Sequence, residues 1–168
     1  KKAIVDAVFL SSGVPAKNPI PPSMWSYNDS VKEDEYNPEA AKKLLAEAGV
    51  TDLKFKLINR SVNHPFTPVS VYVIDQWRRI GVTAEHQQLD VSQQKATIAN
   101  GEFQVALDAF CADSDDPKPL LLPYLSKSRS PRNMTRSESP QFDAVYDRFK
   151  SATNPTQRAV LATELQRM

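Results

Sequence analysis

The sequence predicts an α/β fold with a mostly parallel central sheet flanked by helices. One observation is a set of three segments with the apolar pattern of strands, at residues 53–58, 82–89 and 103–110. Another is that segments with helical spacing separate them, at residues 69–80 and 92–100. The order strand, helix, strand, helix, strand implies right-handed crossovers, which join parallel strands in one sheet.

Two segments precede the clearest helix of the sequence, which lies at residues 37–49. Residues 1–9 have the pattern of an amphipathic helix. Ser11–Glu35 is rich in proline, which fixes φ and removes backbone donors, so we expect extended coil and no strand there. The bulky apolar residues Met24, Trp25 and Tyr27 lie inside this coil, and we expect them to pack on the body of the domain.

The clearest helix lies between Asn37 and Gly49. Asn37 is the expected N-cap, Pro38 occupies the first helical position, and Gly49 ends the helix. On the wet side, Glu39 and Lys43 have the spacing of an i, i+4 ion pair. The opposite face is apolar at helical spacing and consists of Ala41, Leu44, Leu45 and Ala48.

The elements of the predicted sheet follow. Leu53–Ile58 alternates apolar and basic residues, which is typical of a strand with one wet face. A polar loop follows over residues 59–68. Val69–Ile80 also contains some strand-like alternation, but its length before Gly81 favours a helix. The remaining elements, in chain order, are a strand at Val82–Leu89, a short helix at Ser92–Asn100 and a strand at Phe103–Phe110.

The C-terminal part is predicted to be helical. Lys118–Leu125 has the composition of a short apolar helix, and Ser126–Glu138 that of a polar loop. Ser139-Pro140 and Asn154-Pro155 each have the pattern of a helix start, with a capping side chain before a proline.

Composition narrows the range of functions. The 168 residues include 21 Lys and Arg against 20 Asp and Glu, a net charge of +1, without a basic stripe, so we expect no nucleic-acid partner. No apolar run approaches the roughly 20 residues of a membrane span. Cys111 is the single cysteine, so no disulfide forms within this chain, and we expect a buried structural thiol.

The end of the third predicted strand is the candidate site. Ligands of open α/β sheets bind at the carboxyl ends of strands. There Phe110, Cys111, Ala112 and Asp113 offer an aromatic wall and a negative charge. We interpret Asp113 as a group that receives a cation such as an amine. Three residues later, Asp116 precedes a proline and is expected to cap a helix.

These segments resemble a known family. The stretch YNPEAAKKLLAEAG from Tyr36 to Gly49 is similar to a helix of the extracytoplasmic solute-binding proteins of family 5. These proteins are the dipeptide-, oligopeptide- and nickel-binding components of ABC importers. Further similar segments occur in the same order along nearly the whole chain: AKNPIPPSMWSYND from Ala16, QWRRIGV from Gln76, GEF from Gly101, DDP from Asp115 and SPQFD from Ser139.

The resemblance implies a two-lobed periplasmic-binding-protein fold that closes on its ligand by a hinge. Residues 1–168 would be one ligand-binding lobe, the second, cut near both hinge crossings. The expected partners are a short peptide or other small solute, the missing first lobe and the permease subunits of an importer. The expected location is periplasmic or cell-envelope, although a signal peptide cannot be tested in this fragment. No cofactor, resident metal or catalysis is expected.

The resemblance also suggests site residues. Asp113 matches the family position that receives the α-ammonium of a peptide ligand, and Phe110 stands where the family more often has Trp. Cys111 and Ala112 lie between them. His64 stands where dipeptide-binding members tend to carry an Arg that reaches the ligand carboxylate. His is only partly charged near neutral pH and lacks the two-pronged fork, so Arg60 is a candidate to compensate.

Two other classes of function remain open. A metal-dependent hydrolase would use Asp113, Asp115, Asp116 and His64. Its motifs are weak, because the aspartates lack the spacing and glycine of a calcium loop and the two histidines, His64 and His86, lack zinc spacing. The other class is a pure interaction module, such as a docking lobe for importer subunits or chaperones.

Overall fold

The structure is a computed structural model that describes residues 1–33 and 35–168. The predicted coil Ser11–Glu35 contains Asp34, which lies outside the described residues. The chain divides into two compact units, one formed by Lys1–Pro15 with the described part of Asp34–Ala109, the other by Ala16–Glu33 with Phe110–Met168. The expectation that the whole chain is one ligand-binding lobe stays a prediction.

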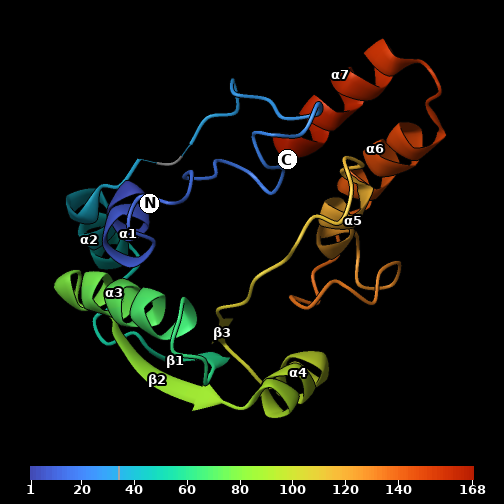
Figure 1. Ribbon diagram of the computed structural model, residues 1–168. Helices are drawn as coiled ribbons and strands as arrows, with labels where there is room; N and C mark the ends of the chain where they lie inside the picture. The colour runs from blue at the N-terminus through green and yellow to red at the C-terminus, as the bar shows by residue number, and fades with distance from the viewer. Residues whose placement is uncertain (34) are drawn as a thin grey trace. The chain divides into compact units, whose positions relative to one another are not determined.

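The first unit contains the predicted parallel sheet (Figure 1). Its strands are β1 (Lys54–Arg60), β2 (Thr83–Leu89) and β3 (Val105–Ala106), in the order β2-β1-β3. Both pairings are parallel, and Leu57 of β1 lies opposite His86 on one side and Val105 on the other. The α/β fold with a parallel sheet is therefore confirmed, and it brings the carboxyl ends of all three strands to one edge.

The described residues of this unit form four helices. They are α1 (Lys2–Val8), α2 (Pro38–Glu47), α3 (Phe66–Arg79) and α4 (Val91–Asn100). Helix α3 packs along β1 and β2 (Figure 1) and buries Phe66, Ser70 and Ile74. It begins at Phe66, three residues before the predicted start at Val69. Helix α4 begins after Asp90, whose carboxylate accepts from the backbone of Ser92 at 2.8 Å and Gln93 at 2.9 Å.

The third strand is shorter than predicted. The alternating pattern indicated Phe103–Phe110, but only Val105 and Ala106 pair with β1. Directly before this paired part, a side chain takes the place of a backbone partner. Gln104 Oε1 accepts the hydrogen bond from Lys56 N at 2.9 Å. The alternation of apolar and polar residues indicates which side chains of a strand face the core. It does not indicate which backbone groups bond to a neighbouring strand, so the pattern overestimated the length of this strand.

Helix α2 has the predicted caps but not the predicted ion pair. Asn37 Oδ1 accepts from Ala40 N at 2.9 Å, and Gly49 has a φ of +68°, the left-handed conformation that suits glycine after a helix. The predicted Glu39–Lys43 pair is wrong, because Lys42 pairs with Glu39 at 3.0 Å and Lys43 with Glu47 at 3.6 Å.

The second unit is built on helix packing. After the coil of residues 16–33 come α5 (Lys118–Leu121), the 3₁₀ helix η1 (Leu122–Tyr124), α6 (Pro140–Ser151) and α7 (Pro155–Gln166). The predicted single helix Lys118–Leu125 is thus divided. Pro123 lacks the N–H that would continue the α-helical hydrogen bonds, which explains the change to a tighter turn.

The core of the second unit includes the proline-rich coil. Met24 is buried and Tyr27 packs against the core, as predicted, whereas Trp25 is half exposed with the Arg158 guanidinium 5.4 Å from its ring centroid. Gln166 on α7 donates to Ser26 O at 2.7 Å and so fastens the coil to this helix. The other buried members of the core are Ile20, Leu121, Leu125, Phe142, Val145, Tyr146, Phe149, Leu161, Ala162 and Leu165.

No helix among the described residues is both long and apolar enough to cross a membrane.

Truncation of this core should be costly. Phe149 on α6 has no exposed surface, so Phe149→Ala removes a buried ring and leaves a cavity, with an expected loss of about 3–5 kcal/mol in the free energy of unfolding. Val160→Ala on α7 is the control, because Val160 is 61% exposed, and it should change the free energy by less than about 0.5 kcal/mol. Urea unfolding followed by circular dichroism measures both, and equal effects would contradict the assignment of the core.

Candidate ligand-binding site

The predicted ligand segment lies in coil of the second unit, directly after Ala109 of the first. Phe110, Cys111, Ala112 and Asp113 belong to no helix or strand and are all exposed, Phe110 by 63%. The expected strand Phe103–Phe110 therefore does not reach this segment. The exposed Cys111 also contradicts the predicted buried thiol. These residues form an accessible segment that presents an aromatic ring and a carboxylate to solvent.

Asp113 is the unpaired carboxylate of this segment. Within the described part of the chain, no hydrogen bond or ion pair engages its side chain. A carboxylate without an internal partner keeps its full capacity to accept hydrogen bonds from a cation. Its geometry is thus compatible with the predicted reception of an amine.

Asp116 has a structural role instead. Its Oδ1 accepts from Lys118 N at 3.0 Å, and its Oδ2 lies 3.2 Å from Lys118 Nζ. Burial raises the pKa of Asp116, but the hydrogen bonds from Lys118 and the charges of Lys118 and Arg158 outweigh it, so the pKa lies below the usual value. Helix α5 begins at Lys118, as predicted, and Asp116 Oδ1 satisfies its first backbone donor.

His64 is in the first unit, in the loop between β1 and α3. Its Nε2 lies 2.9 Å from the carbonyl oxygen of Val8, so this nitrogen carries the proton and donates. The ring also makes an edge contact with Phe9, with 5.6 Å between centroids. His64 therefore ties its loop to the end of α1, and Nδ1 is the ring nitrogen left for other contacts.

Arg60 is engaged at the end of β1. Its Nη2 pairs with Asp108 Oδ1, its Nε donates to Gln94 Oε1 at 3.2 Å, and its guanidinium lies 4.9 Å from the centroid of the Phe66 ring. The sequence suggested Arg60 only as a replacement for a missing arginine. The role of Gln94 was missed, because a glutamine on a polar helix gives no signal of its buried partner.

A second buried polar contact lies in the same sheet. His86 Nε2 is 2.6 Å from Asn59 Oδ1, and Asn59 Nδ2 donates to Arg60 O at 2.8 Å. Burial lowers the pKa of His86, which favours its neutral form. This histidine therefore connects β2 to β1.

The structure gives the metal-dependent alternative no support. Among residues 1–33 and 35–168, no group of three or more His, Cys, Asp and Glu side chains is placed to hold a metal ion. The carboxylate of Asp116 is already paired with Lys118, and His64 Nε2 with the Val8 carbonyl.

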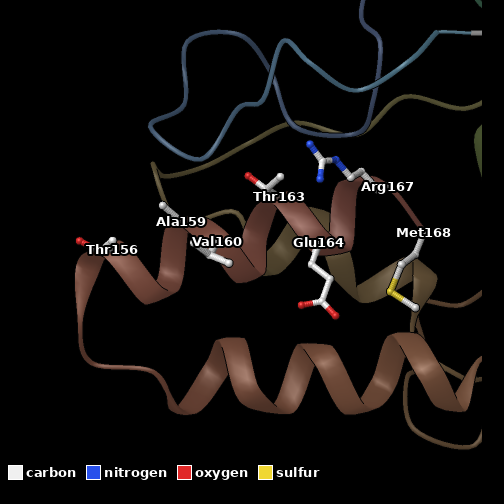
Figure 2. Close-up of a pocket in the computed structure, with 7 residues that line it drawn as sticks. All are labelled: Thr156, Ala159, Val160, Thr163, Glu164, Arg167 and Met168. Atoms are coloured by element: carbon white, nitrogen blue, oxygen red, sulfur yellow. The ribbon is translucent and has the colours of Figure 1, made fainter.

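A surface hollow on the second unit contains none of the predicted residues. Figure 2 shows it along α7, with a volume of about 610 Å³ and a lining that includes Thr156, Val160 and Thr163. Glu164 points from α7 toward α6, where its Oε2 lies 3.8 Å from Arg148 Nη1. This ion pair is a helix–helix contact, and the hollow is shallow surface between exposed side chains.

Comparison with known proteins identifies the family. The sequence model of the bacterial extracellular solute-binding proteins, family 5 Middle, matches residues 1–132. The chain belongs to this family. The resemblance to family 5 that the sequence suggested is thereby confirmed.

Similarity to individual proteins supports the same family assignment. The chain is 34% identical to Heme-binding protein A of Haemophilus influenzae over 99% of its length, and 35% identical to the dipeptide-binding protein of Escherichia coli over 70%. It spans 31% and 23% of those two proteins, respectively. The chain thus corresponds to about a third or less of the length of these curated relatives.

Solved structures share the fold. HbpA2 from Haemophilus parasuis superposes with a TM-score of 0.90 at 28% identity, over 99% of this chain and 34% of that one. A dipeptide-binding protein from Pseudoalteromonas sp. SM9913, solved in complex with Met-Leu, has a TM-score of 0.90 at 23% identity, over the same shares. The second likeness shows the fold alone.

The role of Asp116 predicts a specific response to acid. Because its folded-state pKa is depressed, its ionised form stabilises the fold above about pH 4, and this contribution is lost as the pH falls through the folded-state pKa. Asp116→Asn should be less stable than the wild type at pH 6, with the difference shrinking as the pH falls toward 3. Urea unfolding across this range tests it. Asp115→Asn is the control, and the same pH response in both variants would contradict the assignment.

Proposed function

We propose that the complete protein containing this chain is the solute-binding component of an ABC importer and that its ligand is a short peptide. The observation that carries the proposal is Asp113, an exposed carboxylate without an internal partner, beside the exposed ring of Phe110, in a chain of family 5. Several relatives are named for dipeptide or oligopeptide binding, including the E. coli dipeptide-binding protein and OppA.

Asp113 receives the α-ammonium of the peptide in this proposal. An ammonium group offers three donors, and a carboxylate accepts them as charge-assisted hydrogen bonds, which are about twice as strong as neutral ones. Phe110 supplies apolar surface beside the charge, and Cys111 and Ala112 contribute the backbone between the two side chains. Exclusion of water on ligand binding would strengthen the contact further.

His64 is the proposed contact for the peptide carboxylate. Nε2 is committed to Val8 O, so Nδ1 would make this contact, and it donates only when the ring is protonated. The contact is therefore weaker than one from arginine, which is always charged and offers two parallel donors. This chain would accordingly depend more on the ammonium end of its ligand than on the carboxyl end.

The proposal extends to the rest of the protein. The remaining length would supply a first lobe, joined to this one by a hinge, and closure would enclose the ligand. The closed form would dock on the permease subunits of the importer. The family description, bacterial extracellular solute-binding proteins, supports a periplasmic or cell-envelope location and a binding function without catalysis.

The ammonium contact is tested by titration calorimetry on the complete protein. Asp113→Asn removes the charge but keeps the shape, and the affinity for a dipeptide should fall about 10- to 100-fold, the equivalent of one charged hydrogen bond. Asp115→Asn is the matched control, an exposed carboxylate two residues away whose loss should change the affinity less than twofold. Hemin is titrated in parallel, because one relative is named for heme binding. Equal affinities for Asp113→Asn and wild type, or binding of hemin without peptide, would contradict the proposal.

The carboxylate contact is tested by restoring an arginine. His64→Arg should increase the preference for a dipeptide over its C-terminal amide by about three- to tenfold, since guanidinium adds a permanent charge and a second donor. Asn63→Arg places the same charge one residue earlier, on another exposed side chain. An equal gain in both variants would indicate a general effect of charge and would remove His64 from the site.

A further inference from the structure

Side chains, more than backbone pairing, hold the chain where it leaves the sheet at β3. The paired part of β3 ends at Ala106, and one more backbone bond, from Leu107 N to Ile58 O at 2.9 Å, follows it. From there Gln94 Nε2 donates to Leu107 O at 3.0 Å, and Asp108 pairs with Arg60. We use the name strand-exit clamp for Gln94, Arg60 and Asp108.

The members of the clamp contact one another and their neighbours. Gln94 is 1% exposed, and its amide bridges two groups, since Oε1 accepts from Arg60 Nε at 3.2 Å while Nε2 binds Leu107 O. Phe66 packs under the guanidinium. The Arg60 and Asp108 side chains are only 26% and 29% exposed. Partly shielded ion pairs of this kind contribute little net stability, but they define geometry well, because removal of either partner leaves a desolvated charge.

The clamp holds the residues that directly precede the ligand segment. Asp108 Oδ1 also accepts from Ala109 N at 2.8 Å, so one carboxylate joins the Arg60 side chain to the backbone that leads into Phe110. Four residues after Ala109 comes Asp113. Fixing residues 107–109 reduces the number of conformations open to the segment that follows, and this lowers the entropy cost of ordering it on a ligand.

The clamp also determines which carboxylate is free. Asp108 and Asp113 are both on the chain that leaves β3, and either could attract a cation. Arg60 neutralises Asp108, whereas no described residue pairs with Asp113. Of these two carboxylates, Asp113 is therefore the one left without a compensating charge.

We infer that Arg60 and Gln94 are positioning residues that prepare residues 110–113 to receive the ligand ammonium without touching it. This inference rests on the proposed function, because it specifies how that site is held. It predicts that loss of the clamp reduces specifically the part of the affinity that depends on the ammonium group.

The experiment compares a dipeptide with its N-acetylated form in the complete protein, by titration calorimetry. The ratio of the two affinities measures the ammonium contact alone. Arg60→Met keeps much of the volume against Phe66 but removes the pair with Asp108, and it should lower this ratio about tenfold, with little change in the affinity for the acetylated peptide. Asp108→Asn keeps an acceptor for Ala109 N, so it should lower the ratio less than Arg60→Met does. It also serves as the second clamp variant if Arg60→Met does not fold.

Lys56→Met is the matched control. It replaces another cation of β1 with methionine, at an exposed position where Lys56 Nζ lies 3.9 Å from Glu85, and the ratio should stay within twofold of wild type. An unchanged ratio in the folded clamp variants, or an equal loss of affinity for both peptides, would overturn the inference while leaving the ammonium contact intact. A wild-type protein that binds both peptides equally would instead contradict the ammonium contact itself, and the inference with it.

Discussion

The parallel pairing of β1 on both of its edges is the constraint on which the first unit depends. Because β2 and β3 run in the same direction as β1, the residues that follow each strand emerge at one edge of the sheet. Arg60 at the end of β1 can therefore reach Asp108 beyond β3, 48 positions away in the sequence. A sheet with an antiparallel β3 would place these two residues at opposite edges.

Polar side chains extend this pairing where the backbone stops. The short β3 ladder is continued by Gln104 at its start and by Gln94 and Arg60 at its end. Buried polar groups are costly unless they are satisfied, so each of these contacts also fixes a conformation. In the second unit, buried Asn133 also has its polar groups satisfied. It donates to Leu125 O at 2.6 Å and accepts from Arg136 N at 2.8 Å, and these contacts order the polar loop of residues 126–138.

Membership in family 5 and the exposed ligand segment are consistent with each other. A binding protein needs groups that are accessible before the ligand arrives, and Phe110 and Asp113 fulfil this condition at the expense of burial. A hydrolase would need a base or a metal site held by neighbours, and the described carboxylates are either paired, as in Asp116, or isolated, as in Asp113.

The sequence by itself determined the order of the elements, the parallel sheet, the N-cap Asn37 with Pro38 at the first helical position, and the family. These properties are local or periodic, since a cap depends on residues within one turn and a helix on its 3.6-residue repeat. Only the tertiary structure decided that β3 pairs through two residues, that Cys111 is exposed, and that Arg60 binds Asp108 and Gln94. Burial and long-range partners depend on which segments meet in space, and neither the spacing nor the type of these residues in the chain contains that information.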